Sequence, residues 1–551
     1  MVHYDIICVG GGGAGVMAAV AAAESGATVA IVCKEPVGYG NTRMAVGLTA
    51  CSGLPGDSRE AFIDDMLTAG AGLCNRDLVE ALVDGAPEAI TILESCGHTF
   101  IRDHEGCISE KVLTRAGGHS NARTLLSSGA GVGLSQSLRA AVEKYDISLY
   151  EDTLVLQLIK DGEAVCGIQA LDLAKGEQIS LTAGAVVLCT GGGGWLFYPQ
   201  TSNNRTATGD GYALAFRAGA ELADMEQIQA LPFSITHPNA YRGLICGEPV
   251  VAGPAGRLIN GKGKVFLDGN INRMDRAAVV RSMASEITRG NVAEHGGLLL
   301  DLQPNLGDAE GNNFRERIRA TGIFDSVLPA YGKKAYAWEE PWEVLPTAHY
   351  FMGGVRVDKD GRTTVPGLFA AGEVQSGVHG ANRLGSAALT EVLVFGIRAG
   401  RAAAGHAKQN KDIRAVQPET ENLFGRKGSH RPITLMRKLQ AKLWENVGLV
   451  RDKETLAITL DFIHKISVLA LDVSTSSQPV YNTEVADAIE LGFMLDTASC
   501  VVTSALLREE SRGAHLRSDF PVESDDWRKN IIIWRKEDGS IGHRLEAAPH
   551  E

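Results

Sequence analysis

The segment from residue 4 to residue 24 restricts the possible folds of this chain more than any other part of the sequence. An apolar, β-branched run (YDIICV) precedes a glycine-rich turn, and small apolar residues (VMAAVAAAES) follow it. Gly10, Gly12 and Gly15 have the spacing G-x-G-x-x-G. Between a strand and a helix, such glycines form a tight turn, admit a pyrophosphate close to the backbone and let the helix pack closely on the strand. The segment predicts the first β-α unit of a dinucleotide-binding α/β domain.

Length, charge and cysteine pattern limit the remaining possibilities. At 551 residues the chain is too long for a single core, so two or three domains are expected. A net charge of −13 argues against a nucleic-acid-binding surface. No apolar run is long enough to span a bilayer and no signal-peptide pattern precedes the first strand, so we expect a cytoplasmic protein, at most peripheral to a membrane. The 10 cysteines include no C-x-x-C pair, so neither a disulfide framework nor a metal or iron–sulfur site is expected.

Titratable side chains and glycines gather between Leu345 and Phe395. His349 is followed by a Gly-Gly pair and a short Val-rich strand, and a second apolar strand ends at Glu373. A carboxylate at the end of a buried strand suits a ribityl hydroxyl. The next segment, HGANRLGSAAL, contains glycines that let backbone N–H groups approach a ligand, and it leads into a helix whose N-terminus favours negative charge. This stretch is the predicted meeting point of cofactor and substrate.

These segments, in this order, resemble the flavoprotein subunits of succinate dehydrogenase and fumarate reductase, together with L-aspartate oxidase. The resemblance rests on AHYFMGGV, GLFAAGEV and HGANRLGSAAL, with TGG and TGDG in the middle of the chain and ESRGAH near its end. It implies an α/β fold with a Rossmann-like FAD-binding domain, an inserted α+β capping domain and a C-terminal helical bundle. The expected boundaries are 1–226 and 346–404 for the FAD-binding domain, 227–345 for the capping domain, 405–432 for a linker, 433–520 for the helical domain and 521–551 for the tail.

The resemblance implies FAD that is held without a covalent bond. In succinate dehydrogenases a histidine forms a covalent flavin bond, and Asn41 stands at that position here. Asn41 and Thr42 can hydrogen-bond the isoalloxazine edge, although an ordinary turn explains them equally well. Cys33 stands where a ribose-binding acid is usual, which leaves Glu35 as a candidate, and Lys34 resembles a family variant. The predicted FAD-binding residues are Gly10, Gly12, Gly15, Lys34, Asn41, Thr42, Thr190, Gly191, Asp210, Glu373, Ser386 and Leu389.

Residues 229–233 depart from the family pattern. The dicarboxylate enzymes have Gln-Phe-His-Pro-Thr, whose His and Thr bind one substrate carboxylate, whereas this chain reads QALPF. Leu231 and Phe233 cannot hydrogen-bond a carboxylate, and an ion desolvated without partners is costly, so the distal half of the substrate should not bind as succinate does. In the alternative, the alignment is displaced and His237 supplies the contact. The predicted substrate-binding residues are Leu231, Phe233 and Glu248, the last of which keeps the family's glutamate.

Three residues are predicted to carry the chemistry. By resemblance, Arg276 is the proton donor or acceptor, and Arg383 and His349 hold the substrate carboxylate. Arginine has a high pKa, so its proton-transfer role depends on its position beside a developing carbanion. A purely electrostatic clamp is the alternative for both arginines, and a core histidine bonded to backbone is the alternative for His349.

The expected activity is hydride transfer between flavin N5 and a carbon next to a carboxyl or carbonyl group of a small organic acid. Because the sequence has no haem or cluster motif, a separate electron-transfer partner is expected, and the resemblance implies that this partner is an iron–sulfur subunit. The alternatives are a free-standing oxidase similar to L-aspartate oxidase, a protein similar to the α subunit of adenylylsulfate reductase, and a non-catalytic flavin-binding protein. Ala116 replaces the glutamate that answers the substrate's amino group in L-aspartate oxidase, which argues against aspartate.

Overall fold

The large sheet of the computed structural model begins with the segment that the glycine motif predicts. The structure describes residues 2–307, 309–410, 418, 420 and 422–548. The seven strands have the order β5-β2-β1-β8-β7-β6, with β17 also paired with β8. The strands β5, β2, β1, β8 and β17 are parallel, so their carboxyl ends meet at one edge. Their bounds are β1 Val2–Val9, β2 Val29–Val32, β5 Ile147–Tyr150, β6 Thr153–Asp161, β7 Ala164–Asp172, β8 Glu177–Leu188 and β17 Leu368–Ala370.

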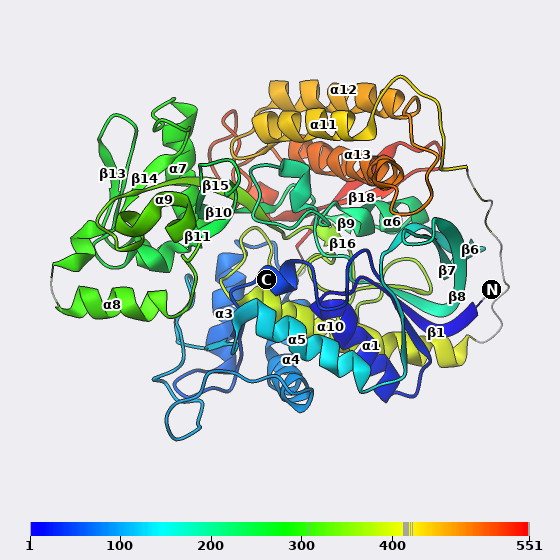
Figure 1. Cartoon of the computed structure of the whole chain (residues 1–551), viewed down its shortest axis with the longest axis horizontal. Coiled ribbons are helices and arrows are strands. Elements are labelled where there is room, and N and C mark those ends of the chain that lie inside the picture. Colours follow the sequence, from blue (N-terminus) through cyan, green and yellow to red (C-terminus); the bar gives the residue numbers. More distant parts are fainter. Residues whose placement is uncertain (1, 308, 411–417, 419, 421, 549–551) are drawn as a thin grey trace.

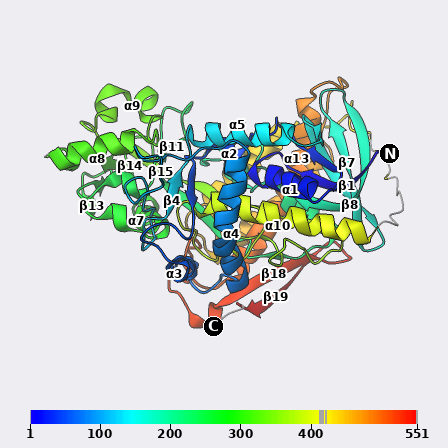
Figure 2. The ribbon, with the colours of Figure 1, turned by 90° about the horizontal axis from the view of Figure 1, so that it is seen from below.

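Helices cover this sheet and bring distant parts of the chain together. Helices α1 and α10 lie side by side (Figures 1 and 2). Their close approach depends on glycine, because a Cβ at Gly400 would lie 2.2 Å from the carbonyl oxygen of Ala18. The helices of this part are α1 Gly13–Glu24, α2 Asn41–Met44, α3 Arg59–Ala69, α4 Arg76–Ser95, α5 Ala130–Glu143, α6 Asp210–Ala218 and α10 Ala387–Gln409; a short sheet pairs β3 Leu48–Ala50 with β4 Thr124–Leu126. We call the large sheet and these elements the nucleotide-binding part.

A second sheet of six strands builds a separate lobe, which lies at the left of Figure 1 and which we call the cap. The strand order is β11-β10-β15-β14-β12-β13, and the cap has a hydrophobic core of its own that includes Phe233, Trp338 and Trp342. Adjacent strands β10 and β15 connect it to the nucleotide-binding part. The bounds are β10 Ile228–Ile235, β11 Ile245–Gly247, β12 Arg257–Ile259, β13 Val265–Asp268, β14 Leu298–Asp301, β15 Trp342–Phe351, α7 Arg276–Thr288, α8 Ala309–Arg319 and α9 Val327–Tyr336.

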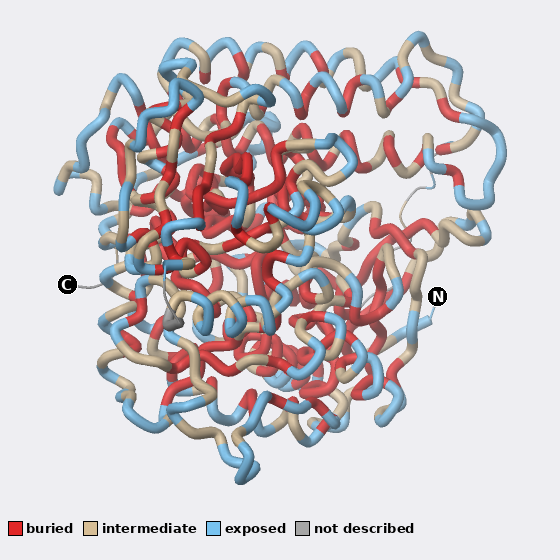
Figure 3. Tube along the Cα trace, turned by 60° about the vertical axis from the view of Figure 1, so that its left-hand side comes forward, coloured by how far each residue is buried: buried red, intermediate tan, exposed pale blue. Residues whose placement is uncertain are grey.

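Three helices and a hairpin complete the chain. The helical bundle consists of α11 Pro432–Val447, α12 Lys453–Ala470 and α13 Thr483–Leu507, and α12 turns a largely exposed face outward (Figure 3). The hairpin joins β9 and β16 in a four-stranded sheet and consists of β18 Lys529–Arg535 and β19 Ile541–Ala547; β9 is Leu222–Ala223 and β16 is Gly354–Val355. Helix α10 continues to Gln409, beyond the predicted start of the linker at residue 405, and residues 411–417, 419 and 421 of that linker lie outside the described residues. Among the described residues, no helix is long and apolar enough to cross a membrane.

A buried network of ion pairs ties the C-terminal segment to the nucleotide-binding part. The guanidinium of Arg508 is fully buried and bonds Glu226 at 2.6 Å, Glu510 at 3.1 Å and Asp224 at 3.2 Å. Burial and the neighbouring Glu226 carboxylate raise the pKa of Asp224 to about 7. The arginine therefore balances carboxylates from segments more than 280 residues apart in the sequence.

Replacing Arg508 with alanine should destabilise the protein by about 3–5 kcal/mol, because the substitution leaves buried carboxylates without their cation. Chemical denaturation followed by circular dichroism measures this loss. The matched control is Arg535→Ala, since Arg535 is exposed on β18 and its removal should change stability by less than about 0.5 kcal/mol. Equal losses in the two variants would contradict a stabilising role for the network.

Candidate functional site

The glycine-rich turn joins β1 to α1 at the carboxyl edge of the large sheet. Gly10 has φ +116°, and a Cβ there would lie 2.2 Å from the carbonyl oxygen of Cys189. A Cβ at Gly15 would lie 1.9 Å from the carbonyl oxygen of Gly10. At Gly12 the nearest atom is Thr42 Oγ1, at 3.6 Å, so a side chain there would point into open space. Two glycines thus permit close packing, and Gly12 keeps the space in front of the turn free.

This space belongs to a large cavity that extends from the turn to the cap. Its empty volume is about 1690 Å³, with the open mouth included. The cavity collects residues from β1, β2, β15 and α10, whose ends meet at this edge. Of the residues predicted to bind FAD, all except Gly15 line it; Gly15 lies behind the turn. The lining members are Gly10, Gly12, Lys34, Asn41, Thr42, Thr190, Gly191, Asp210, Glu373, Ser386 and Leu389.

The residues around the turn fit a flavin dinucleotide. The N-terminus of α1 faces the space that Gly12 leaves free, which suits a pyrophosphate. Thr190 Oγ1 is buried and has no hydrogen-bond partner among the described residues, so a bound ligand can satisfy it. Glu373 follows β17 and accepts a hydrogen bond from the Phe351 N–H at 3.1 Å. Burial raises the pKa of Glu373 to about 7, so this carboxyl can donate or accept a hydrogen bond near neutral pH.

The Lys34 ammonium has two carboxylate partners within the chain. Lys34 Nζ lies 2.8 Å from Glu490 and 2.9 Å from Asp210. Burial alone would lower the pKa of Lys34, but the two carboxylates outweigh it and raise the pKa. Lys34 lines the cavity as the centre of an ion-pair cluster. The neighbouring Glu35 also lines it and accepts a hydrogen bond from Asn204 Nδ2 at 3.0 Å.

Asn41 connects the flavin side of the cavity to the loop that supports His349. Its Nδ2 donates to Asn203 Oδ1 at 2.6 Å, and its Oδ1 accepts from the Asn204 N–H at 3.0 Å. Asn203 Nδ2 in turn donates to the carbonyl oxygen of His349 at 2.8 Å. The Asn41 side chain therefore positions protein groups around the cavity.

Arg276 begins helix α7 of the cap and faces the cavity. Its guanidinium forms a two-pronged ion pair with Glu248, with Nε donating to Oε2 at 2.7 Å and Nη2 donating to Oε1. Nη1 donates to Gln229 Oε1 at 2.9 Å. Only 8% of Arg276 is exposed, whereas Glu248 is half-buried. The pair gives Arg276 a fixed orientation and places a carboxylate where it can exchange protons with the guanidinium.

Arg383 approaches the cavity from the nucleotide-binding part and has no carboxylate in hydrogen-bond contact among the described residues. Its Nη1 donates to the Leu384 carbonyl oxygen at 3.1 Å, and its Nε has no partner within the described part of the chain. The guanidinium lies 4.8 Å from the centre of the Tyr350 ring, a cation–π distance. The Tyr350 hydroxyl donates to the buried carboxylate of Glu391. Burial, together with the positive charge of Arg276, lowers the pKa of Arg383 to about 10.

His349 lies on β15 and completes the group. Its Nδ1 lies 2.8 Å from Ser202 Oγ, so the serine hydroxyl orients the ring. Burial and the positive charges of Arg383 and Arg276 lower its pKa well below the ordinary value of 6.5. The imidazole is therefore neutral at neutral pH. The structure thus brings four predicted residues to one cavity, namely His349, Arg276, Arg383 and Glu248.

The structure does not place Leu231 and Phe233 with that group. Both side chains are fully buried, and Phe233 belongs to the hydrophobic core of the cap. Neither residue lines the cavity. Their predicted place among the substrate-binding residues is therefore corrected: both side chains are buried in the protein, and neither faces the cavity.

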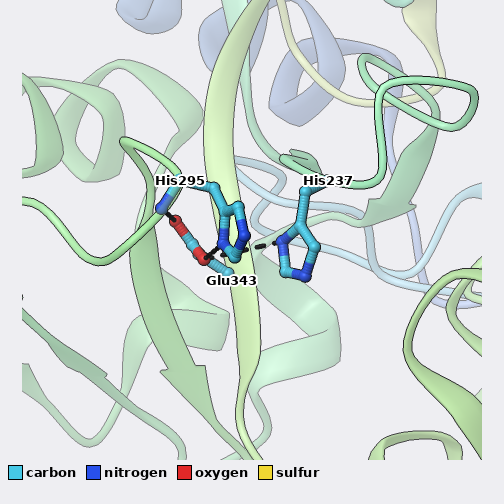
Figure 4. A group of neighbouring side chains, drawn as sticks. All are labelled: His237, His295 and Glu343. Atoms are coloured by element: carbon cyan, nitrogen blue, oxygen red, sulfur yellow. Dashed lines mark hydrogen bonds and ion pairs between the residues drawn. The ribbon is translucent and has the colours of Figure 1, made fainter.

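His237, the alternative carboxylate ligand, belongs to a different cluster in the cap (Figure 4). Its ring stacks on His295 at 3.7 Å between ring centres, and both imidazoles approach Glu343 Oε2, at 3.5 Å and 2.8 Å respectively. Two rings only 16° from parallel at this separation cannot both hold one ion in their planes, so the arrangement does not suit a metal. His237 does not line the cavity, and its alternative role is not supported.

Sequence reasoning missed several residues that hold the site together. Tyr350 and Glu391 lie within segments that the sequence analysis singled out. Glu391 is a lone glutamate in the apolar helix α10, and this pattern indicates a buried carboxylate that needs hydrogen-bond partners. Gln229 bridges the two arginines, since its Oε1 accepts from Arg276 and its Nε2 donates to the Arg383 carbonyl oxygen at 2.8 Å. Ser202 gives no signal in the sequence, because a distant loop brings it to His349.

Comparisons with known proteins cover nearly the whole chain. The FAD binding domain family matches residues 5–389, and the Fumarate reductase flavoprotein C-term family matches residues 436–550. One of the subunits of the fumarate reductase (CoM/CoB) of Methanothermobacter marburgensis is 35% identical over 97% of this chain and 97% of that protein. L-aspartate oxidase of Streptomyces coelicolor is 34% identical over 99% of this chain and 94% of that protein. The solved structure of Mycobacterium smegmatis Sdh1 in complex with UQ1 covers 100% of this chain and 95% of its own, with a TM-score of 0.87 and 29% identity.

Proposed function

Because the chain belongs to the FAD-binding family of fumarate reductase and succinate dehydrogenase flavoproteins, which includes L-aspartate oxidase, we propose that it is the catalytic subunit of a reductase or dehydrogenase of organic acids. The predicted family, fold class and FAD cofactor are confirmed, and the chain is an FAD-dependent oxidoreductase. The proposal adds the reaction: two hydrogens are added to, or removed from, a carbon–carbon bond next to a carboxyl group. The observation that carries it is the convergence of Arg276, Arg383 and His349 on the dinucleotide cavity.

Arg276 is proposed to move the proton. Glu248 holds the guanidinium by two hydrogen bonds and is half-buried, so it can pass protons between Arg276 and the exterior. Arginine is a weak acid, and its proton-transfer role requires that the accepting carbon lie beside it. The ion pair with Glu248 fixes the position of the Arg276 guanidinium. The positive charge of this guanidinium also stabilises negative charge on the substrate.

Arg383 and His349 are proposed to hold the substrate carboxylate. Arg383 is buried with an unpartnered Nε among the described residues, so a carboxylate can satisfy donors that the protein leaves free. The neutral imidazole of His349 can contribute one further N–H if its tautomer is set by the Ser202 contact. Bound FAD supplies the acceptor or donor of the hydride.

An iron–sulfur protein is proposed as the electron partner. The related M. marburgensis protein is named as one subunit of its enzyme, which supports a multi-subunit assembly for this chain. The ten cysteines are all free thiols, nine of them buried, and the one group of His, Cys, Asp and Glu side chains that lies close enough to share an ion in the described part of the chain contains no cysteine. Co-purification of the native protein from its source and iron analysis of the complex test this proposal.

An amino-acid substrate finds little support in the structure. Ala116 lies beside Gly385, since a Cβ added at Gly385 would lie 3.0 Å from the Ala116 Cβ. A methyl group there cannot bind an ammonium. The relation to L-aspartate oxidase therefore supports the fold and cofactor more than the substrate.

The reaction class can be tested by anaerobic titration of the purified yellow protein. A saturated acid that is a substrate should bleach the flavin absorbance, and an unsaturated acid that is a substrate should restore it after photoreduction. If no carboxylic acid in a broad panel does either, and none binds, the proposed function is wrong.

The flavin should be released when the protein is denatured. Asn41 stands where a covalent bond would form, and its amide is not a nucleophile and is already hydrogen-bonded to Asn203 and Asn204. Acid precipitation should give a colourless pellet and a yellow supernatant. A pellet that keeps the flavin fluorescence, or a protein mass increased by that of FAD, would contradict this expectation.

Carboxylate affinity should fall as the pH rises through about 10. Arg383 has a pKa lowered to about 10, so its guanidinium is charged below this pH and loses its charge above it. His349 should add no loss near pH 6.5, because its pKa lies well below 6.5. The measurement is the dissociation constant of a saturated carboxylate from the flavin spectrum, with circular dichroism to confirm that the protein stays folded. A constant affinity throughout would contradict a loss of charge at Arg383 in this pH range.

A further inference from the structure

The charged groups at the substrate end of the cavity leave one positive charge unbalanced. Glu248 neutralises Arg276 through a two-pronged ion pair, and His349 is neutral because burial and the two arginines lower its pKa. Arg383 has no carboxylate in hydrogen-bond contact among the described residues. Burial raises the pKa of Glu373 to about 7, and ionisation of this carboxyl would make the balance less positive. The remaining lining cation, Lys34, is paired with Asp210 and Glu490.

One wall of the cavity is apolar where the cap meets the nucleotide-binding part. Val46, Leu48 and Met44 line it from the segment that ends α2 and follows it, and Ile245 lines it from β11 of the cap. Val46 also packs against the hydrophobic core of the cap, which places this wall at the junction of the two parts. Such side chains offer no hydrogen bond to an ion.

The polar residues that follow β10 do not compensate for this wall. The Thr236 N–H donates to the Tyr331 hydroxyl at 3.0 Å, and His237 lies against His295 and Glu343. Neither Thr236 nor His237 lines the cavity. A second carboxylate in the cavity would therefore lose its hydrating water without gaining a cationic partner. Burying an unpaired ion is costly, so a dicarboxylate should bind more weakly than a monocarboxylate.

We propose that the substrate is a monocarboxylate with an apolar substituent, namely a 2-enoic acid or its saturated counterpart, rather than a dicarboxylate. The carboxylate binds Arg383 and His349, and the substituent faces Val46, Leu48 and Ile245. This inference rests on the proposed function, because the reacting bond is still the one next to the carboxyl group. In the reduction, the carbon–carbon double bond gains two electrons and two protons, and the electrons are exchanged with FAD; the oxidation is the reverse.

Binding to the FAD-loaded protein tests the inference without turnover. Isothermal titration with 3-phenylpropionate, butyrate and succinate at neutral pH should give at least about tenfold tighter binding of 3-phenylpropionate than of succinate, since the second carboxylate lacks a partner. After anaerobic photoreduction, cinnamate or crotonate should reoxidise the flavin faster than fumarate does. The binding measurement is independent of the activity.

A variant of the apolar wall locates the substituent. Val46→Gln adds a polar side chain to the wall and should weaken 3-phenylpropionate binding by at least about fivefold, while succinate binding changes little or improves. The matched control is Val265→Gln, on strand β13 and away from the cavity, which should leave both affinities unchanged.

The outcomes distinguish a failure of the monocarboxylate inference from a failure of the proposed function. Tighter binding and faster reaction of succinate and fumarate would overturn the monocarboxylate assignment and leave the proposed function in place. Binding of neither class, with no bleaching or reoxidation by either, would overturn both. Equal effects of Val46→Gln and Val265→Gln would overturn the assignment of the wall, and with it the inference.

Discussion

Replacing Arg276 with alanine should reduce turnover by about 10²–10⁴-fold or more while the protein still binds FAD, because a positioned proton-transfer group contributes on this scale. The flavin-binding residues lie in the nucleotide-binding part, whereas Arg276 comes from helix α7 of the cap. The substitution therefore removes the proposed proton-transfer group at the cap end of the cavity and leaves the residues around the glycine-rich turn unchanged. The measurements are flavin content by absorbance and the rate of flavin reoxidation by the best unsaturated acid.

The control lies on the same helix. Arg281 is exposed on α7, so Arg281→Ala removes an equal charge and leaves the ion pair with Glu248 in place. Its turnover should stay within about twofold of the parent protein, as is usual for exposed positions. Equal rates for the Arg276 and Arg281 variants would mean that Arg276 has no part in the chemistry. A non-catalytic flavin-binding protein would give that result.

A valine at Gly12 should abolish FAD binding and yield a colourless protein that remains folded. The Cβ of residue 12 would have only Thr42 Oγ1 and the Tyr39 carbonyl oxygen as neighbours, at 3.6 and 3.8 Å, so the fold can accept it. The methyl groups would instead occupy the space in front of the α1 N-terminus, where the pyrophosphate should approach. FAD titration by fluorescence quenching should show at least about a 100-fold loss of affinity, the scale set by the loss of close backbone contacts to phosphate.

Gly405→Ala is the matched control for this substitution. Gly405 lies on the exposed side of α10 and has no atom within 4 Å of an added Cβ. Alanine there should bind FAD normally and stabilise the helix by about 0.5–1 kcal/mol. FAD binding by Gly12→Val at parent affinity would show that the pyrophosphate does not lie at the turn.

The sequence predicted the nucleotide-binding part well because its signals are local. The strand, the glycine turn and the helix carry their own spacing, and Gly10 and Gly12 take the roles that this spacing predicts. The sequence also singled out Arg276, His349 and Arg383, which line one cavity in the structure, since each stands in a short segment with a recognisable pattern. Local order along the chain was sufficient for these residues.

The other features of the site depend on contacts between residues that are distant in the sequence. Leu231 and Phe233 lie on β10, the strand that also carries Gln229. Because side chains alternate between the two faces of a strand, the sequence did not show that Phe233 points into the hydrophobic core of the cap. The ion pairs of Lys34 were not predicted, because its partners Asp210 and Glu490 come from 176 and 456 residues later in the chain. Such pairings follow from tertiary packing.

Gln229 lies where β10 leaves the nucleotide-binding part for the cap, and it touches one arginine from each side. Its amide accepts from Arg276 and donates to the backbone of Arg383. Gln229 therefore ties the orientation of the Arg276 side chain to the course of the backbone at Arg383. A shift of the cap along β10 would therefore move both arginines relative to each other, so the distance between the two guanidinium groups depends on how the cap is seated.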